Sequence, residues 1–289
     1  MKFALFSGST PEWTPETLVS KLAQQGWDGV EWRVVDQKPS TEVGFWAGNR
    51  ATFPETGIVG HIDEIRKITS GAGLEQAAVA AYVPIGDRAN TEFMLAATAA
   101  MGAGRVRFNV PKAAPGTNYQ DLFAATRADA EFVAKRAAEH GVQVVIQIHH
   151  GNIVSTASAA VRLLDGLDPR YIGAIHDLGN LTIEGREGLQ SHVPGLQILG
   201  PYLAHVHVKN AVWKPGAPRE DGTVDWAWEW APLRTGAGDL PGYLSSLKEV
   251  GYDGWVTVED FTTELPLEER IADDIAYLRA SAAAAGISD

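Results

Sequence analysis

The sequence predicts an α/β protein that forms a single (β/α)8 barrel (TIM barrel) over residues 1–289, and three observations support this fold class. Eight short runs of β-branched and apolar residues occur along the chain, and their starts recur about every 36 residues, as in a chain of βα units. Longer segments of helical period lie between these runs. We find no linker between them, so eight units favour a closed barrel over an open sheet.

The expected strands follow one another at regular intervals. They cover residues 2–7, 29–35, 75–83, 105–110, 142–149, 171–177, 203–209 and 254–260. Helix ends are marked most clearly at 14–26, where Thr14 can cap, Pro15 takes the first helical position and Gly26 follows the end. The helical segments at 119–141 and 266–286 also close with glycine.

Two connections are unusually long, at residues 36–60 and 210–238. Both follow a strand, which in a barrel places them at the C-terminal face, where such proteins build their sites. Loops of this length inside a compact domain are usually functional. Their aromatic content suits carbohydrate stacking, a contact in a homo-oligomer, or local packing alone. They contain five of the nine tryptophans: Trp46, Trp213, Trp226, Trp228 and Trp230.

Composition restricts the partners. The formal net charge is −12, so nucleic acid and anionic membranes would be repelled, and a small-molecule ligand is favoured. The chain has no cysteine, which excludes disulfides, thiolate metal sites and a cysteine nucleophile. The apolar stretch at the N-terminus is too short for a signal sequence or a membrane span, so we expect a cytoplasmic protein.

The stretch "AHVHVKN" at 204–210 shows how the strands divide their two faces. Val206 and Val208 share one face and should pack outward under the helices, because successive side chains of a strand point to opposite sides. His205, His207 and Lys209 share the other face and should climb the inner wall toward the mouth. His205 lies one layer deeper than His207, and we interpret it as structural.

The same alternation brings polar side chains to the ends of strands five to eight. The residues concerned are Gln147, His149, Asp177, His207 and Glu259. Buried carboxylates are costly unless they are paired or bound to metal, so their recurrence at successive strand ends favours a site. A neutral imidazole with two or three oxygen ligands suits one divalent ion: Mn²⁺ by preference, or Mg²⁺, Co²⁺ or Zn²⁺.

Several of these stretches together resemble the xylose-isomerase-like barrels known as sugar phosphate isomerases/epimerases. The resemblance covers nearly the whole chain and rests on "GWDGVEWR", "IQIHHG", "IGAIHDLGN", "LAHVHVKN" and "GYDGWVTVED". It implies a metal site formed by the ends of strands five to eight, which by position gives Gln147, Asp177, His207 and Glu259. The family has glutamate where this chain has Gln147.

This departure bears on the chemistry, because an amide cannot take a proton. The pattern "QIHHG" is similar to the His-x-His-x-Gly strand of inosose dehydratases in the same superfamily, with His149 at the second histidine. His149 could replace the missing base or join the metal. We predict His149 and Glu259 as the catalytic acid/base residues, and expect His149 to titrate between roughly pH 6 and 8 unless the metal occupies it. The predicted substrate contacts are Glu31, Arg107, Asn180, Lys209 and Trp46; Glu31 and Arg107 could instead form internal ion pairs.

Four functions compete. The first is a metal-dependent isomerase or epimerase of a keto or aldo sugar that works through an enediolate. The second is a metal-dependent lyase that performs β-elimination on an inosose or a 3-keto-glycoside, which the missing glutamate favours. The others are an apurinic-site endonuclease, which the absence of a basic rim disfavours, and a non-catalytic sugar-binding barrel.

Overall fold

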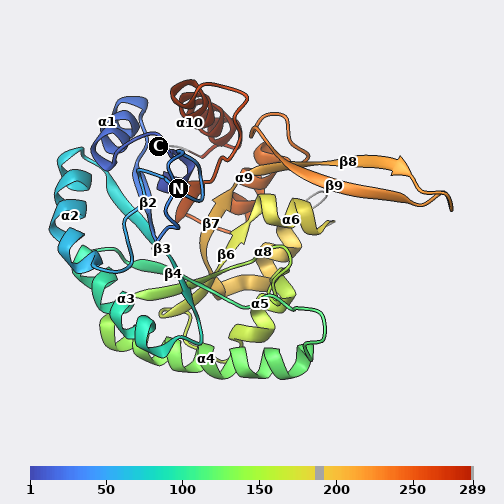
Figure 1. The fold of residues 1–289 in the computed structure, drawn as a ribbon, viewed down its shortest axis with the longest axis horizontal. Helices are drawn as coiled ribbons and strands as arrows, with labels where there is room; N and C mark the ends of the chain where they lie inside the picture. The colour runs from blue at the N-terminus through green and yellow to red at the C-terminus, as the bar shows by residue number, and fades with distance from the viewer. Residues whose placement is uncertain (186–191, 288–289) are drawn as a thin grey trace.

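The computed structural model describes residues 1–185 and 192–287 and confirms the closed barrel (Figure 1). Its strands are all parallel and close in the order β1-β10-β7-β6-β5-β4-β3-β2. Their bounds are β1 Lys2–Phe6, β2 Gly29–Val34, β3 Glu75–Pro84, β4 Arg105–Asn109, β5 Gln143–Gln147, β6 Ile172–Asp177, β7 Leu203–Val208 and β10 Trp255–Val258. The eight expected runs therefore all form strands of the barrel.

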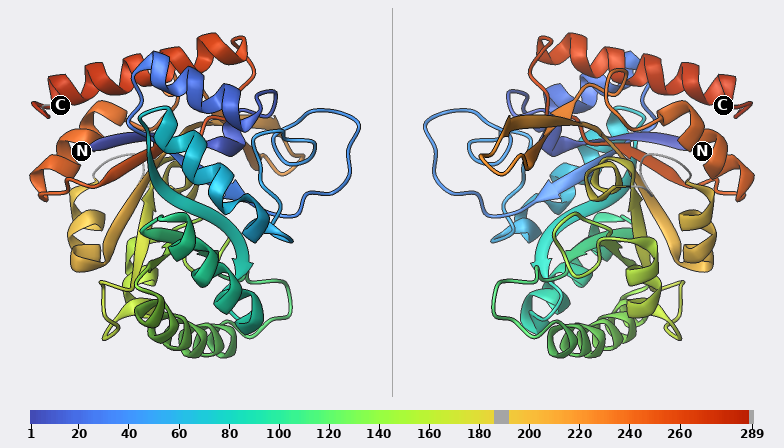
Figure 2. Two further views of the ribbon diagram at one scale, coloured as in Figure 1. Left: turned by 90° about the vertical axis from the view of Figure 1, so that its left-hand side faces the viewer. Right: turned by 90° about the vertical axis from the view of Figure 1, so that its right-hand side faces the viewer.

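Helices surround the barrel on its outer side (Figure 2). Their bounds are α1 Pro15–Gln25, α2 Ile62–Gly71, α3 Arg88–Met101, α4 Tyr119–His140, α5 Ala157–Leu164, α6 Leu178–Glu184, α8 Val193–Leu199, α9 Leu240–Glu249 and α10 Leu267–Ala284. The expected cap at Thr14 forms, since its side chain accepts a hydrogen bond from the backbone N–H of Thr17. In the described part of the chain, no helix combines the length and the apolar character that crossing a membrane requires.

The main hydrophobic core lies between the barrel and these helices. Val206 and Val208 of β7 are fully buried in it, as are Val256 and Val258 of β10. The alternation predicted for these strands therefore places their valines outward and leaves the opposite face of each strand for the barrel interior.

The connection after β7 is a β-hairpin and not the irregular loop that its length suggested. β8 (Asn210–Pro218) pairs antiparallel with β9 (Val224–Ala231), and the hairpin extends away from the barrel (Figure 1). Gly222 adopts a φ of 84° near its tip, a left-handed conformation that glycine tolerates. The alternating tryptophans of "VDWAWEW" are the period-two signal of a strand.

The connection after β2 contains the short 3-10 helix η2 (Ile58–His61) and otherwise consists of loops and turns. It lies at the same end of the barrel as the hairpin (Figure 2). Side chains from both segments line one pocket there, which is described below. The two long connections therefore meet over the end of the barrel that carries the polar strand ends.

Candidate metal and substrate site

Four polar strand ends meet at this end of the barrel. Gln147 closes β5, Asp177 closes β6, His207 lies in β7, and Glu259 directly follows β10. The parallel register sets Asp177 beside His207, and it sets His207 beside Thr257, two residues before Glu259. All four side chains are buried. The strand pairing itself therefore brings them together.

Three of these side chains form a donor cluster that fits a divalent ion. One ligand atom from each of Asp177, His207 and Glu259 lies within 4.8 Å of the others. Nδ1 of His207 is 3.4 Å from Oε1 of Glu259 and 3.9 Å from Oδ2 of Asp177. Two carboxylates and an imidazole are donors that Mn²⁺, Co²⁺ and Zn²⁺ accept. The cluster could therefore hold a metal ion, whereas the identity of the metal stays a prediction.

Gln147 meets this cluster through its amide nitrogen. Its Nε2 is 2.6 Å from Oδ2 of Asp177 and 3.0 Å from Nδ1 of His207. Its Oε1 accepts a hydrogen bond from Nη1 of Arg107 at 3.2 Å. An amide binds metal through oxygen, so a role as fourth ligand requires the amide to turn over. That role stays a prediction.

Lys209 lies within the cluster and not merely beside it. Its Nζ donates to Oδ2 of Asp177 at 2.5 Å and to Oε2 of Glu259. Burial opposes the charge, but the two carboxylates raise the pKa of Lys209 above its usual value. Burial would also raise the pKa of Glu259, but Lys209 and His207 hold it well below the usual range. The candidate site therefore contains its own cation.

Glu31 is not among the residues that line the pocket, and its contact with substrate stays a prediction. It is fully buried, and its Oε2 lies 3.0 Å from Nε2 of both His205 and His207. Burial would raise the pKa of Glu31, but the two histidines hold it below its usual range. With Nε2 bound to Glu31, His207 directs Nδ1 at the cluster, the arrangement by which a carboxylate orients a metal-binding imidazole.

The two histidines of β7 differ in their electrostatics. Burial would lower the pKa of His207, but the carboxylates of Glu31 and Glu259 raise it to about 9. For His205, one layer deeper, burial outweighs Glu31 and lowers the pKa to about 4. Nε2 of His205 is also 2.9 Å from Oγ1 of Thr257. His205 thus contacts Glu31 and Thr257 in the layer beneath the site and has a structural position.

Asn180 is also not among the residues that line the pocket, and its contact with substrate stays a prediction. It is fully buried, and its Nδ2 donates to Oδ2 of Asp177 at 2.7 Å. Its Oδ1 lies 2.8 Å from Nδ1 of His150. Asp177 caps α6 and accepts from the backbone N–H of Asn180 at 3.0 Å. Asn180 therefore orients Asp177 and His150.

A pocket of about 430 Å³ opens above the cluster. Trp46 from the connection after β2 lines it, together with Trp228 and Trp230 of the hairpin. Arg107 reaches it from β4, and Nη1 lies 3.5 Å from Oε1 of Glu259. Aromatic faces beside a few charged groups suit a small polar ligand such as a sugar. Contact of Trp46 and Arg107 with substrate stays a prediction.

His149 lines the same pocket, two residues beyond the end of β5. Its Nδ1 lies 2.8 Å from the carbonyl oxygen of His150, to which it donates, so Nε2 is the ring atom that can accept a proton. Burial and the nearby ammonium of Lys209 lower the pKa of His149 to about 4. Our expectation that this group titrates between roughly pH 6 and 8 is therefore wrong, and the imidazole is uncharged at neutral pH.

Several residues that line this pocket were not predicted from the sequence: Tyr82, Val110, Lys112, His150, Asn152 and Phe261. The ring of Tyr82 lies 4.5 Å from the guanidinium of Arg107. Features of the sequence could have identified two of these residues: Tyr82 lies near the end of the third expected strand, and His150 directly follows His149 in "HHG". Lys112 lies beyond the end of a strand, where alternation gives no direction.

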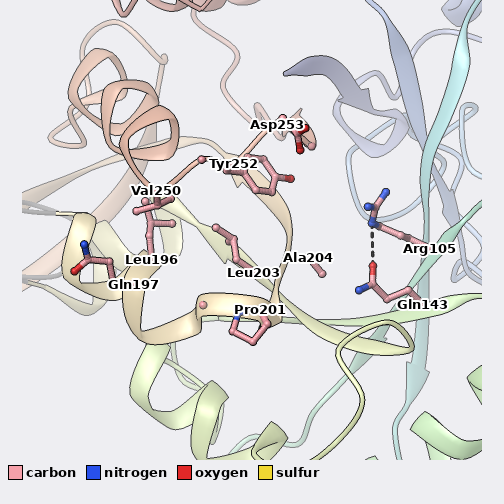
Figure 3. A pocket seen from close by; sticks show the side chains of 13 residues that line it. Arg105, Gln143, Leu196, Gln197, Pro201, Leu203, Ala204, Val250, Tyr252 and Asp253 are labelled. Carbon is pink, nitrogen blue, oxygen red and sulfur yellow. Dashed lines mark hydrogen bonds between the residues drawn. The ribbon is translucent and has the colours of Figure 1, made fainter.

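Another cavity, of about 630 Å³, lies at the opposite end of the barrel (Figure 3). Arg105, Gln143 and Leu203 line it, and they are the first residues of β4, β5 and β7. Nε of Arg105 donates to Oε1 of Gln143 at 3.1 Å. None of the predicted site residues lines this cavity. Because barrel enzymes carry their catalytic residues at the carboxyl ends of the strands, we place the candidate site in the smaller pocket.

Comparisons with known proteins bear on the family and the fold. A profile of the xylose isomerase-like TIM barrel family matches residues 19–281. Inosose dehydratase from Lacticaseibacillus casei is 26% identical over 140 residues, which cover 45% of this chain and 44% of that protein. The match therefore spans less than half of this relative's length.

Solved structures match over a greater length. The 3-keto-D-glucoside 4-epimerase from E. coli has a TM-score of 0.71 at 16% identity and covers 97% of this chain and 99% of its own. The IOLI protein with a bound zinc atom has a TM-score of 0.72 at 16% identity and covers 99% of this chain and 98% of its own. At such identities the likeness shows the fold alone.

Proposed function

The chain belongs to the xylose isomerase-like TIM barrel family, and from this premise we propose that it is a lyase that removes water from a small keto-cyclitol or keto sugar. The reaction would begin with loss of a proton from the carbon next to the carbonyl. The match to inosose dehydratase supports a substrate of this class. The arrangement of His149 and Gln147 supports elimination in particular.

The observation that carries the proposal is that His149 lines the pocket with an uncharged imidazole whose Nε2 can accept a proton. The sequence resemblance also implies a glutamate at the position of Gln147. In a β-elimination, Nε2 would accept the proton and the C–H electron pair would form the enolate. The enolate then forms the C=C bond as the β C–O bond breaks, and His149 returns the proton to the departing hydroxyl. One imidazole thus suffices to release water.

Two positively charged side chains that line the pocket with His149 would stabilise the enolate. Arg107 is 3% exposed, Lys209 is 3% exposed, and both line the pocket. Fixed cationic donors aimed at developing negative charge lower the barrier most effectively in a buried site. A divalent ion held by Asp177, His207 and Glu259 would add polarisation of the substrate carbonyl.

An isomerase or epimerase that acts on a keto or aldo sugar is the second candidate, and the position of Glu259 favours it. Glu259 lines the pocket and could exchange a proton opposite His149. However, Glu259 is already paired with Lys209, His207 and Arg107, and it is one of the three donors of the proposed metal cluster, so it is less free than His149 to exchange a proton. For this reason we place elimination first.

The proposal extends to the cofactor and the setting of the protein. Mn²⁺ is the ion we propose, with Mg²⁺, Co²⁺ and Zn²⁺ as alternatives. We propose a small carbohydrate as ligand, a cytoplasmic location, and a homo-oligomer as one assembly that the exposed aromatic side chains would permit. Elemental analysis and the solution mass of the purified protein test the ion and the assembly.

The deciding experiment is incubation with a panel of inososes and keto sugars in D₂O, followed by mass spectrometry. We expect a product that has lost one water. Recovery of a deuterated isomer without water loss would favour the second candidate. Unlabelled starting material throughout the panel, with the protein loaded with each of the four ions in turn, would contradict both.

A further inference from the structure

We infer that Lys209 is an internal competitor for the metal position, and that its ammonium must leave Asp177 and Glu259 before a divalent ion binds there. The inference rests on the proposed function, because it concerns the same cluster. It adds that entry of the ion moves a lysine side chain into the substrate pocket.

The first argument is that lysine and metal would use the same oxygen atoms. Nζ of Lys209 donates to Oδ2 of Asp177 and to Oε2 of Glu259. Oδ2 is also the oxygen of Asp177 closest to Nδ1 of His207, at 3.9 Å. An ion bound to this oxygen at about 2.0–2.2 Å would lie against the ammonium. The two cations therefore cannot occupy the cluster together.

The second argument is the charge balance of the buried site. The two carboxylates face two cations, Lys209 and Arg107, the latter 3.5 Å from Oε1 of Glu259. All four side chains are buried. These four charges already balance, so a divalent ion would add positive charge that a proton lost from His207 offsets only in part, in a region where such charge is costly. Departure of the ammonium reduces this excess.

The third argument is that the lysine has somewhere to go. Lys209 lines the pocket, and its Nζ lies 5.4 Å from the ring centroid of Trp230, close enough for a cation–π contact. The base of its side chain and its carbonyl group pack against Gly179, where a Cβ would clash with Cγ of Lys209 and lie 2.9 Å from its carbonyl oxygen. Only the outer part of the side chain needs to move, and the displaced ammonium would then face the substrate.

The test compares the affinity for Co²⁺, measured by titration calorimetry, between the wild type and Lys209→Met. Methionine keeps much of the apolar length but leaves both carboxylates free for the ion. We expect Co²⁺ to bind more tightly to the variant by on the order of tenfold to hundredfold. Equal or weaker binding by a folded Lys209→Met protein would overturn the inference.

Lys112→Met is the matched control. Lys112 lines the same pocket, but none of its contacts in the described structure reaches Asp177 or Glu259. Lys112→Met removes the same positive charge as Lys209→Met, but farther from the two carboxylates. We therefore expect the affinity for Co²⁺ to change by less than about threefold, through long-range electrostatics alone. An equal gain in both variants would show a general charge effect and would also overturn the inference.

Crystals of the wild type grown with and without Co²⁺ provide a measurement that needs no variant. We expect Nζ to lie between the carboxylates without the ion and beyond hydrogen-bonding distance from both with it. An ion in the cluster beside an unmoved Nζ would overturn the inference. The D₂O panel separates this inference from the proposed function. Loss of water from a substrate while Lys209 stays in place would support the proposed function and contradict the inference. Displacement of Lys209 by Co²⁺ without any turnover would support the inference and contradict the proposed function.

Discussion

His149 illustrates at the residue scale how position decides chemistry. It lies just beyond the end of β5, where the chain turns and its backbone N–H bonds to the carbonyl of Val154 at 3.0 Å. Nδ1–H donates a hydrogen bond to the carbonyl oxygen of His150, which leaves Nε2 as the ring atom that can accept a proton. An imidazole fixed in one tautomer is prepared to accept a proton at one defined atom.

We therefore predict that His149→Asn lowers water loss by about 10² to 10⁴, the usual contribution of a positioned acid/base group. The melting temperature should hardly change, because a side chain at the barrel mouth contributes little to the core. Turnover of a substrate from the D₂O panel measures the effect. His61→Asn is the control, because this half-buried histidine at the end of η2 is not among the residues that line the pocket. Unchanged turnover in His149→Asn would leave Glu259 as the base and favour the isomerase.

Alternation along a strand predicted which residues enter the barrel, but it predicted only some of the contacts between them. Asp177, His207 and Glu259 could be grouped from sequence because they end neighbouring strands. Glu31 could not be placed, because β2 and β7 are not neighbours and meet only across the barrel interior. The reach of Lys209 into the cluster depends on side-chain conformation, which strand periodicity does not fix.

At the scale of elements, the last strand and the last helix meet through a buried group of charges. Asp260, just after β10, accepts a hydrogen bond from Arg270 of α10 at 3.2 Å. Asp274, one turn further along α10, is buried beside them. Burial and the neighbouring Asp260 raise the pKa of Asp274 well above its usual range. Folding therefore favours the protonated form of Asp274.

A pH-dependent stability follows from this raised pKa. The proton on Asp274 stabilises the fold below the unfolded-state pKa of about 3.9, and this contribution is lost as the pH rises through the higher folded-state pKa. Asp274→Asn resembles the protonated form and does not titrate. We expect the melting temperature of Asp274→Asn to exceed that of the wild type at pH 8, and the gap to narrow as the pH falls toward 5. A gap that widens on acidification would contradict the assignment.

At the scale of the whole molecule, the pocket is assembled from segments far apart in the chain. Trp46 comes from the connection after β2, Trp228 and Trp230 come from the hairpin, and the charged floor comes from the ends of the barrel strands. The sequence predicted that both long connections cover this end. It did not predict the hairpin, because we interpreted the long connection as a loop and did not treat the short alternation of "VDWAWEW" within it as a strand.

The hairpin therefore divides into a base that shapes the pocket and an arm that does not. Replacing residues 216–225 with Asn-Gly would rejoin Pro215 and Trp226, which face each other across the two strands, through a tight turn. The excised ion pair of Arg219 and Asp225 is exposed, so the free energy of unfolding should change by less than about 1 kcal/mol. The KM of the shortened protein should match the wild type, whereas Trp228→Ala should raise KM by up to about tenfold through lost stacking on the ligand. If shortening the arm raises KM as much as Trp228→Ala does, the arm must reach a ligand or a second subunit, because the base that lines the pocket would still be present.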